Sequence, residues 1–238
     1  MNASSQARAP VLTIDGPSGA GKGAVSSRVA RALGWNVLDS GAVYRSVALA
    51  ALQQGLSARD EAGLVELCRD LPLAFEAGEQ GIEVILDGRP LGDALRAEQV
   101  SVMSSQVAAI PAVREALLDL QRSFQAEPGL VADGRDMGTV VFPDAEVKIF
   151  LDASVTERAR RRYQQLKQKG QLKDQGEDVT FDRLFRDLEE RDRRDRERAV
   201  SPTIPADDAV VVDSTRMTLD EVVNRVEQLV RQGLCPPD

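Results

Sequence analysis

Residues 14–24 read IDGPSGAGKGA and place four glycines and one lysine at the end of the apolar run VLTI. The spacing from Gly16 to Lys22 is G-x-x-x-x-G-K, and the helical pattern AVSSRVARAL follows it. In a strand, loop and helix of this kind, backbone N–H groups and the helix N-terminus face an anion, and the lysine reaches the phosphates. The stretch therefore predicts a nucleotide-phosphate loop, with an ordinary glycine-rich turn as the alternative. The residues predicted to bind ATP are Gly16, Pro17, Ser18, Gly19, Ala20, Gly21, Lys22, Gly23 and Ala24.

The residue after the lysine departs from the usual motif. A Ser or Thr there would place a hydroxyl on Mg²⁺, but Gly23 and Ala24 follow the lysine. We therefore expect the metal ligands elsewhere, and Ser26 and Ser27 are expected on the surface of the helix. Carboxylates at the ends of predicted strands could hold the ion through waters, and the sequence leaves open which one does so. These candidates are Asp15, Asp39, Asp133 and Asp136.

The composition limits the chemistry of the chain. Its 238 residues include no histidine, which excludes Ser-His-Asp and Cys-His nucleophilic schemes and HExxH zinc sites. Phosphoryl transfer remains, because it depends mainly on positioning and on cations that stabilise the transferred group. The net charge of −8 argues against a general binder of nucleic acid or of anionic membranes.

The composition also predicts the setting of the protein. The first ten residues lack the apolar stretch of a signal peptide, and no run of about 18 apolar residues occurs, so we expect a cytoplasmic protein. Cys68 and Cys235 have no CxxC spacing, which argues against a disulfide framework or a zinc site. No large exposed apolar stripe is evident, and we expect a monomer.

Short β-rich runs that end near Asp or Gly organise the chain. They lack polar alternation, which is typical of parallel strands buried on both faces by helices. The runs are VLTIDG (11–16), NVLDSG (36–41), LVADG (130–134), VKIFLD (147–152) and AVVVDS (209–214). With helical patterns between them, the sequence predicts an α/β fold built on a doubly wound, five-stranded parallel sheet.

Two intervals are longer than a strand–helix–strand crossover needs. Residues 73–92 alternate apolar and polar residues around Gly-rich turns, which predicts a small antiparallel β insert. The helices that follow it are expected to break at Pro111. Residues 154–208 predict two charged helices joined by the polar tip KGQLKDQGEDVT, an arrangement that suits a helical lid with a mobile tip.

Local signals mark several helix ends. SVTE (154–157) and TLDE (218–221) have the spacing of a capping box, which starts a helix just after a strand. Gly170 and Gly233 are expected to end the helices that follow, because glycine readily adopts the left-handed conformation of a helix C-terminus.

Two segments at strand ends predict contacts to a second substrate. DSGAVYR (39–45) opens a helix, with Ser40 at its cap and Tyr44 and Arg45 one turn later, and a plain cap is the alternative role of Ser40. ADGRDMGTVVFPD (132–144) places Arg135 between two carboxylates. An arginine oriented in this way can clamp a phosphate, whereas an ordinary surface ion pair is the alternative.

A third segment, ERDRRDRERA (190–199), concentrates charge on one side of a helix. Helical spacing places Arg191, Arg194, Asp195 and Arg198 on one face, with Asp192 and Arg193 pointing elsewhere. A solvated helix face is the alternative. The neighbouring run RARRR (158–162) favours a lid that delivers cations onto transferring phosphates.

Together these segments strongly resemble the bacterial cytidylate kinases, which are P-loop nucleoside monophosphate kinases. The resemblance spans essentially the whole chain, through TIDGPSGAGKG, LDSGAVYR, SSQVAAIPAVREAL, ADGRDMGTVVFPDAEVKIFLDAS and ERDRRDRERAVSP. It implies transfer of the γ-phosphoryl group of ATP to CMP or dCMP, with Mg²⁺ as cofactor. Where family members commonly carry Thr this chain has Ala24, and its lid tip is a few residues longer.

The resemblance also implies site residues. The residues expected to act in catalysis are Lys22, Arg135, Asp136, Arg162 and Arg194, the arginines at 162 and 194 as lid cations. The residues expected to bind CMP are Ser40, Tyr44, Arg45, Ser105, Arg114, Arg135, Asp136, Arg191, Asp195 and Arg198. Among these, Arg45 and Arg135 are expected at the acceptor phosphate, Ser105, Arg114 and Asp136 at the base, and Arg191 and Asp195 at the sugar.

As a domain plan, the resemblance implies a single kinase unit. The core is expected to comprise residues 10–64, 97–153 and 205–238, the nucleotide-monophosphate-binding insert residues 65–96, and the lid residues 154–204. Two other functions stay open, namely a kinase of broader base preference that includes UMP and a nucleotide-gated binding module that hydrolyses ATP slowly. The number of arginines around the acceptor favours a kinase, because a second phosphorylated substrate needs its own clamp.

Overall fold

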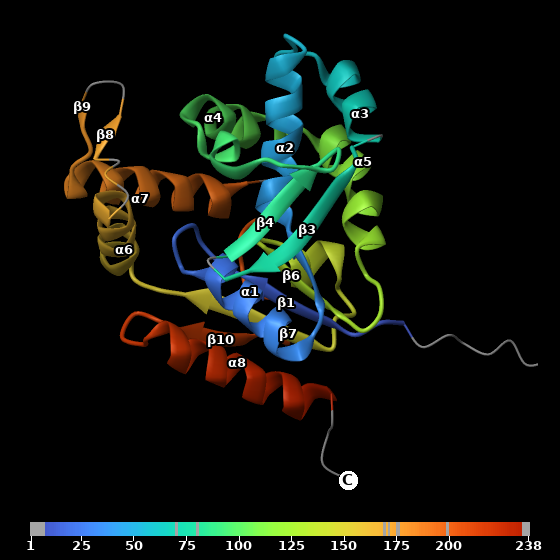
Figure 1. Cartoon of the computed structure of the whole chain (residues 1–238), viewed down its shortest axis with the longest axis vertical. Helices are drawn as coiled ribbons and strands as arrows, with labels where there is room; N and C mark the ends of the chain where they lie inside the picture. Colours follow the sequence, from blue (N-terminus) through green and yellow to red (C-terminus); the bar gives the residue numbers. More distant parts are fainter. Residues whose placement is uncertain are drawn as a thin grey trace, which may run out of the picture.

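The computed structural model describes residues 8–69, 71–79, 81–168, 170, 172–174, 177–198 and 200–234. Its centre is a five-stranded sheet in the order β10-β7-β1-β6-β2, and every neighbouring pair is parallel (Figure 1). The strands are β1 (Val11–Asp15), β2 (Asn36–Asp39), β6 (Leu130–Gly134), β7 (Val147–Asp152) and β10 (Val210–Asp213). All five predicted runs form strands, and the predicted doubly wound, five-stranded parallel sheet is confirmed.

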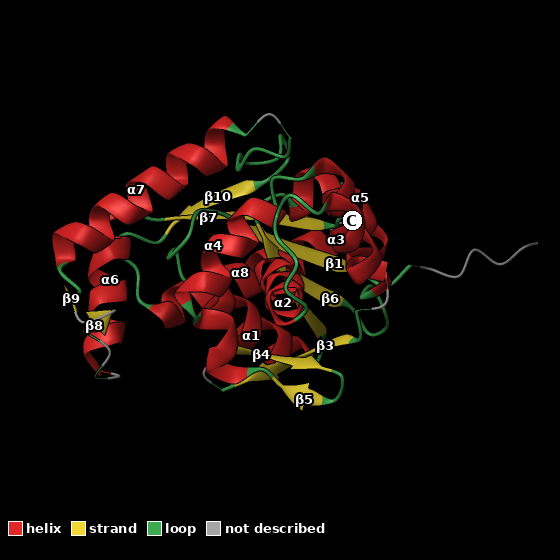
Figure 2. Cartoon of the chain, turned by 90° about the horizontal axis from the view of Figure 1, so that it is seen from above, coloured by secondary structure: helices red, strands yellow, loops and turns green. Residues whose placement is uncertain are grey.

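Helices cover both faces of this sheet (Figure 2). Helices α1 (Lys22–Leu33) and α8 (Leu219–Leu234) pack in one core, and α2 (Ser40–Gln53), α3 (Glu61–Arg69), α4 (Glu98–Val107) and α5 (Pro111–Ser123) pack in the other. Helices α6 (Val155–Gln168) and α7 (Phe181–Glu197) stand to one side of the sheet (Figure 1). Alternate strand residues separate two cores: Leu12 packs with α1 and α8, whereas Val11 packs with α2, α3, α4 and α5. The central strands β1, β6 and β7 are apolar without interruption because both of their faces are buried, whereas the edge strand β10 exposes Val210 and Val211.

The antiparallel insert is confirmed, and it covers more of the molecule than the sequence indicates. It consists of β3 (Leu73–Gly78), β4 (Gly81–Leu86) and β5 (Arg89–Pro90), in the order β3-β4-β5. The Ser27 hydroxyl on α1 donates a hydrogen bond of 2.6 Å to the carbonyl of Gly78. Ser26 and Ser27 are both buried, so their predicted place on the helix surface is wrong. The insert packs against the side of α1 that local sequence pattern leaves free.

The helical parts of the two long intervals also follow the sequence. Pro111 stands at the first position of α5, as predicted, after the break that ends α4. A short 3₁₀ helix (Gly92–Arg96) joins the insert to α4. The predicted charged helices are α6 and α7, and the tip between them carries a small antiparallel hairpin of β8 (Lys173–Asp174) and β9 (Glu177–Asp178). Residues 169, 171, 175 and 176 of this tip lie outside the described residues.

Three of the four predicted helix-end signals are confirmed. The amide of Glu157 donates to the Ser154 hydroxyl at 3.3 Å, and Thr218 and Glu221 exchange hydrogen bonds in a reciprocal capping box. Gly170 follows α6 with φ +66. Gly233, in contrast, lies inside α8, where a Cβ atom would come within 2.5 Å of the Val147 side chain. This glycine permits close packing of α8 on β7 and does not end the helix.

The division into core, insert and lid stays a prediction. Helix α3 runs across residue 65, the predicted start of the insert, and places Leu64 and Cys68 in the same buried cluster. Cys68 is a buried free thiol, whereas Cys235 lies outside the described residues. Within the described ranges, no helix combines the length and the apolar character needed to cross a bilayer.

Candidate active site

The glycine-rich stretch forms a loop between the end of β1 and the start of α1 at Lys22. Gly16, Gly19 and Gly21 have φ of +146, +81 and +99, which L side chains rarely adopt. At Gly16 a Cβ atom would also meet the carbonyl oxygen of Leu151 at 2.0 Å. The Lys22 ammonium donates to the Pro17 carbonyl at 3.0 Å. The loop therefore has the tight backbone and the enclosed cation of an anion cradle.

The loop faces a cleft of about 710 Å³. Six of the nine predicted ATP-binding residues line it, namely Ser18, Gly19, Gly21, Lys22, Gly23 and Ala24. The other three support the loop from below: Gly16 lies against Leu151, and the carbonyls of Pro17 and Ala20 accept hydrogen bonds from Lys22 and Arg161. Of the two predicted lid cations, Arg162 lines this cleft and Arg194 does not.

Two buried carboxylates, Asp15 and Asp133, lie beside the phosphate loop, and Asp133 lines the cleft. The Asp15 side chain accepts hydrogen bonds of 2.8 Å from the amides of Met137 and Gly138. Burial raises the pKa of Asp15 to about 7, against the lowering effect of these two hydrogen bonds. Asp133 lies 4.0 Å from the Lys22 ammonium, and burial raises the pKa of Asp133 and lowers that of Lys22. Asp15 thus joins the loop after β1 to the turn after β6.

A second cleft of about 390 Å³ opens beside the first, between α2, α4, α5 and α7. All ten residues predicted to bind CMP line it, although they come from five separate parts of the chain. They are Ser40, Tyr44, Arg45, Ser105, Arg114, Arg135, Asp136, Arg191, Asp195 and Arg198. Arg194 lines the same cleft, so the predicted shared face of α7 is confirmed. We call this space the acceptor cleft.

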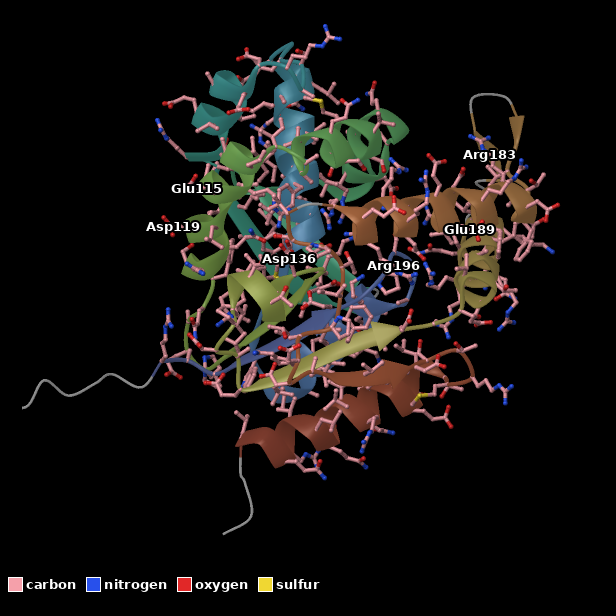
Figure 3. All side chains as sticks on the ribbon, turned by 180° about the vertical axis from the view of Figure 1, so that it is seen from behind. Glu115, Asp119, Asp136, Arg183, Glu189 and Arg196 are labelled. Carbon is pink, nitrogen blue, oxygen red and sulfur yellow. The ribbon has the colours of Figure 1, made fainter. Side chains whose placement is uncertain are left out.

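One end of the acceptor cleft is an aromatic and ionic pocket. The Arg114 guanidinium lies 5.7 Å from the centre of the Tyr44 ring and pairs with the Asp136 carboxylate. Burial raises the pKa of Tyr44 to about 12, although Arg114 opposes this, so the phenol keeps its proton near neutral pH. Figure 3 shows Asp136 in the interior, whereas Glu115 and Asp119 lie on the outer side of α5. A flat polar ring would meet both a donor and an acceptor here.

The other end of the acceptor cleft concentrates positive charge. Arg45 pairs with Asp39 at 3.0 Å, and Arg135 pairs with Asp195 at 2.5 Å. Burial, and then the neighbouring Arg135, lower the pKa of Arg191 to about 10. Arg45, Arg135 and Arg191 line both clefts. The three guanidinium groups therefore stand where an anion in one cleft would face an anion in the other.

Two buried contacts were not predicted from the sequence. The Ser40 hydroxyl donates to the side-chain oxygen of Gln121 at 2.6 Å, and both residues are buried. Ser40 is the first residue of α2, and the cap is Asp39, whose carboxylate accepts from the amide of Ala42 at 2.8 Å. The sequence does carry a signal for the first contact. Gln121 lies four residues after Leu117, on the apolar face of α5, where a polar side chain needs a buried partner. The second is the buried pair of Arg158 and Asp192.

The donor set for a divalent cation is small. In the described part of the chain, no group of three His, Cys, Asp or Glu residues could hold a metal ion. Asp15 is occupied by two backbone amides, Asp39 by Arg45 and a helix cap, and Asp136 by Arg114. Asp133 remains at the phosphate loop, and a Cβ atom at Gly23 would lie 3.5 Å from it. This set fits Mg²⁺, which in proteins is held by one or two carboxylates together with waters and substrate phosphates.

Comparisons with known proteins agree with this geometry. The family model described as cytidylate kinase matches residues 12–232. The cytidylate kinase of Aeromonas salmonicida is 54% identical over 226 residues, which cover 95% of this chain and 96% of the relative. The cytidylate kinase of Aliivibrio salmonicida is 56% identical over 225 residues, which cover 94% of this chain and 98% of the relative. The chain therefore belongs to the cytidylate kinase family.

Proposed function

We propose that this protein transfers the γ-phosphoryl group of ATP to CMP or dCMP, giving ADP and CDP or dCDP. The observation that carries the proposal is the position of Arg45, Arg135 and Arg191, which line both clefts at once. A slow ATP hydrolase would need one cation at the transferred group, whereas two phosphorylated substrates need cations that face both. Membership in the cytidylate kinase family supports the same reaction.

In the proposed reaction, ATP lies on the phosphate loop and the monophosphate lies in the acceptor cleft. A phosphate oxygen of CMP attacks the γ-phosphorus, a new P–O bond forms, and the bond to the β-phosphate oxygen breaks to release ADP. Lys22 and Arg162 face the donor phosphates, and Arg45 and Arg135 hold the acceptor phosphate. Their charge stabilises the negative oxygens of the transferred group in the transition state.

The remaining acceptor residues are proposed to select the nucleotide. Asp136 accepts a hydrogen bond from the cytosine amino group, with Arg114 and Ser105 at the same base. Uracil has a carbonyl oxygen there, which would face the carboxylate and leave buried groups unpaired. Arg191, Arg194, Asp195 and Arg198 lie along the sugar and phosphate, whereas Ser40 and Tyr44 form the floor of the cleft.

Mg²⁺ is proposed as the cofactor, held by ATP phosphates, waters and Asp133. When bound, it would neutralise charge on the β- and γ-phosphates. Gly23 and Ala24 supply no hydroxyl to the ion. The Lys22 ammonium and the Asp133 carboxylate lie 4.0 Å apart at the loop, beside the proposed place of the ion.

The proposal is tested by ADP formation from MgATP with CMP, dCMP, UMP, AMP or no acceptor. Strong stimulation by CMP and dCMP is expected. Equal rates with UMP would establish a broader base preference, and turnover that needs no acceptor would replace the kinase with a binding module that hydrolyses ATP. A monomer acting in the cytoplasm on small nucleotides belongs to the same proposal, and light scattering of the purified protein checks the monomer.

The base contact is tested by Asp136→Asn. The amide keeps the shape of the side chain but can present a donor to uracil, so we expect the preference for CMP over UMP in kcat/KM to fall by about ten-fold or more. Asp119→Asn, on the outer side of the same region, is the matched control and should leave the preference unchanged. An unaltered preference in Asp136→Asn would contradict the proposed base contact.

A further inference from the structure

The Arg158 side chain joins three separate parts of the molecule. Its Nε atom donates to the Ala153 carbonyl at 2.9 Å, and its Nη1 atom donates to the Ser18 carbonyl at 2.8 Å. The same Nη1 atom donates to Asp192 at 3.1 Å, and Nη2 pairs with the second oxygen of that carboxylate. One planar guanidinium on α6 therefore connects the phosphate loop with α7.

The phosphate loop is shaped for this contact. Ser18 lies in the loop and lines the cleft in front of it. At the next residue, Gly19, a Cβ atom would come within 3.3 Å of the Arg158 Cβ atom. A side chain at Gly19 would therefore crowd α6. The backbone of the loop and the stem of Arg158 pack directly against each other, and a shift of either would move the other.

The other end of the connection lies among groups of the acceptor cleft. Asp192 directly follows Arg191 and precedes Asp195 by three residues on α7. Both of those side chains line the acceptor cleft, whereas the neighbouring Asp192 side chain is buried against Arg158. The position of Asp192 thus sets the rotation of the helix that presents Arg191 and Asp195 to the acceptor.

From this arrangement we infer that Arg158 and Asp192 form a positioning pair that couples nucleotide binding at the phosphate loop to the placement of the acceptor-binding side chains of α7. The inference rests on the proposed function, because it takes the ligands of the two clefts to be ATP and CMP. The shared Nη1 atom is the coupling element. A displacement of the Ser18 carbonyl changes the geometry of the hydrogen bond that Nη1 donates to Asp192. The Asp192 carboxylate is enclosed, with its side chain only 6% exposed.

Calorimetric titration of CMP, with and without a non-hydrolysable ATP analogue and Mg²⁺, tests this coupling. In the wild-type protein we expect the analogue to tighten CMP binding about five-fold or more, within the usual range of coupling between sites. In Asp192→Asn we expect the factor to fall below about two-fold. Arg193→Gln removes a charge from an exposed position of the same helix and should keep the wild-type factor.

A second variant separates coupling from simple support of the fold. Replacement of the pair by Arg158→Met and Asp192→Leu fills the site with apolar groups, which commonly restores stability. It cannot restore the hydrogen bond to Ser18, so we expect normal thermal stability with the coupling still lost. Recovery of the wild-type factor in this variant, or an unchanged factor in Asp192→Asn, would overturn the inference. Wild-type protein that binds the ATP analogue but never CMP would instead overturn the proposed function.

Discussion

Helix α7 takes part in two arginine–aspartate pairs that lie three residues apart and differ in almost every respect but their chemistry. Arg158 and Asp192 have side chains that are 1% and 6% exposed. Arg135 and Asp195 have side chains that are 17% and 18% exposed and line the acceptor cleft. In the first pair, the Arg158 guanidinium also donates to the carbonyls of Ala153 and Ser18, whereas the second pair faces the acceptor cleft. The same two residue types therefore form an enclosed structural pair at Arg158 and Asp192, and a pair open to a cleft at Arg135 and Asp195.

The physical difference is the cost of separating the partners. A buried charge that loses its partner cannot recover its hydration, so removal of one member is strongly destabilising. A pair beside a cleft can exchange its partner for water or for a ligand anion at small cost. Asp195 also has Arg191 and Arg198 nearby, so it keeps cationic neighbours if Arg135 turns to the proposed acceptor phosphate.

The largest effect is expected on catalysis, at Arg135, which is proposed to contact the transferred phosphoryl group. We expect Arg135→Ala to lower kcat by about 10³-fold or more, because an arginine at a transferred phosphoryl group contributes that much. Thermal stability should change little. Steady-state kinetics with CMP, together with thermal unfolding, measure both quantities.

Arg135→Lys provides the matched control for this prediction. It keeps the charge but loses the planar fork, so we expect part of the activity to return. Loss of activity below about ten-fold in Arg135→Ala would mean that this guanidinium does not reach the transferred group. If Arg135→Ala unfolds near room temperature, the pair of Arg135 and Asp195 is needed for stability, as the buried pair is.

The next effect is expected in stability and not in chemistry. Asp192→Ala leaves the Arg158 charge buried without a partner, so we expect the free energy of unfolding to fall by about 3–5 kcal/mol. Urea denaturation at neutral pH measures this change. A loss of less than about 1 kcal/mol would show that water reaches Arg158 in the variant, and that the pair resembles Arg135 and Asp195 more closely than its burial suggests.

The two pairs also differ in how far the sequence predicts them. The strands and the phosphate loop follow from local patterns, because parallel strands end at one edge and collect polar residues there. Ser105 and Arg114 are expected at the acceptor only from the resemblance to cytidylate kinases. The spacing of α7 predicts that Asp195 shares a face with Arg191, and that Asp192 points away. It cannot identify the partner of Asp192, which is 34 residues distant in the chain.

Other unpredicted contacts have the same origin. Ser27 meets Gly78 across 51 residues, and Ser40 meets Gln121 across 81 residues. Each depends on which elements pack together, and no local signal of periodicity or capping carries that information. The wrong surface position predicted for Ser27 arises in this way, because the insert that it contacts lies elsewhere in the sequence.

The contribution of Asp195 to stability should depend on pH. Burial acts to raise the pKa of Asp195, but Arg135, followed by Arg198 and Arg191, lowers it below its ordinary value. A carboxyl with a lower pKa in the folded chain stabilises the fold above its unfolded pKa of about 3.9, and this contribution is lost as the pH falls through the folded value. The difference in unfolding free energy between wild type and Asp195→Asn should stay constant from about pH 5 to 9 and shrink below about pH 4. A difference that already shrinks near pH 6 would contradict the lowered pKa.

The smallest effect is expected for a third pair on α7, which is mostly exposed. Arg193 lies 3.7 Å from Glu197, one turn along the helix, and both side chains are about two-thirds exposed (64% and 66%). Water solvates both charges whether or not they pair, so we expect Arg193→Ala to change the free energy of unfolding by no more than about 0.5 kcal/mol. Urea denaturation beside Asp192→Ala makes the test direct, because the two positions are adjacent on one helix. If Arg193→Ala lowers the free energy of unfolding nearly as much as Asp192→Ala does, burial does not determine how much each pair stabilises the fold. Helix α7 would then be sensitive to the removal of any charge.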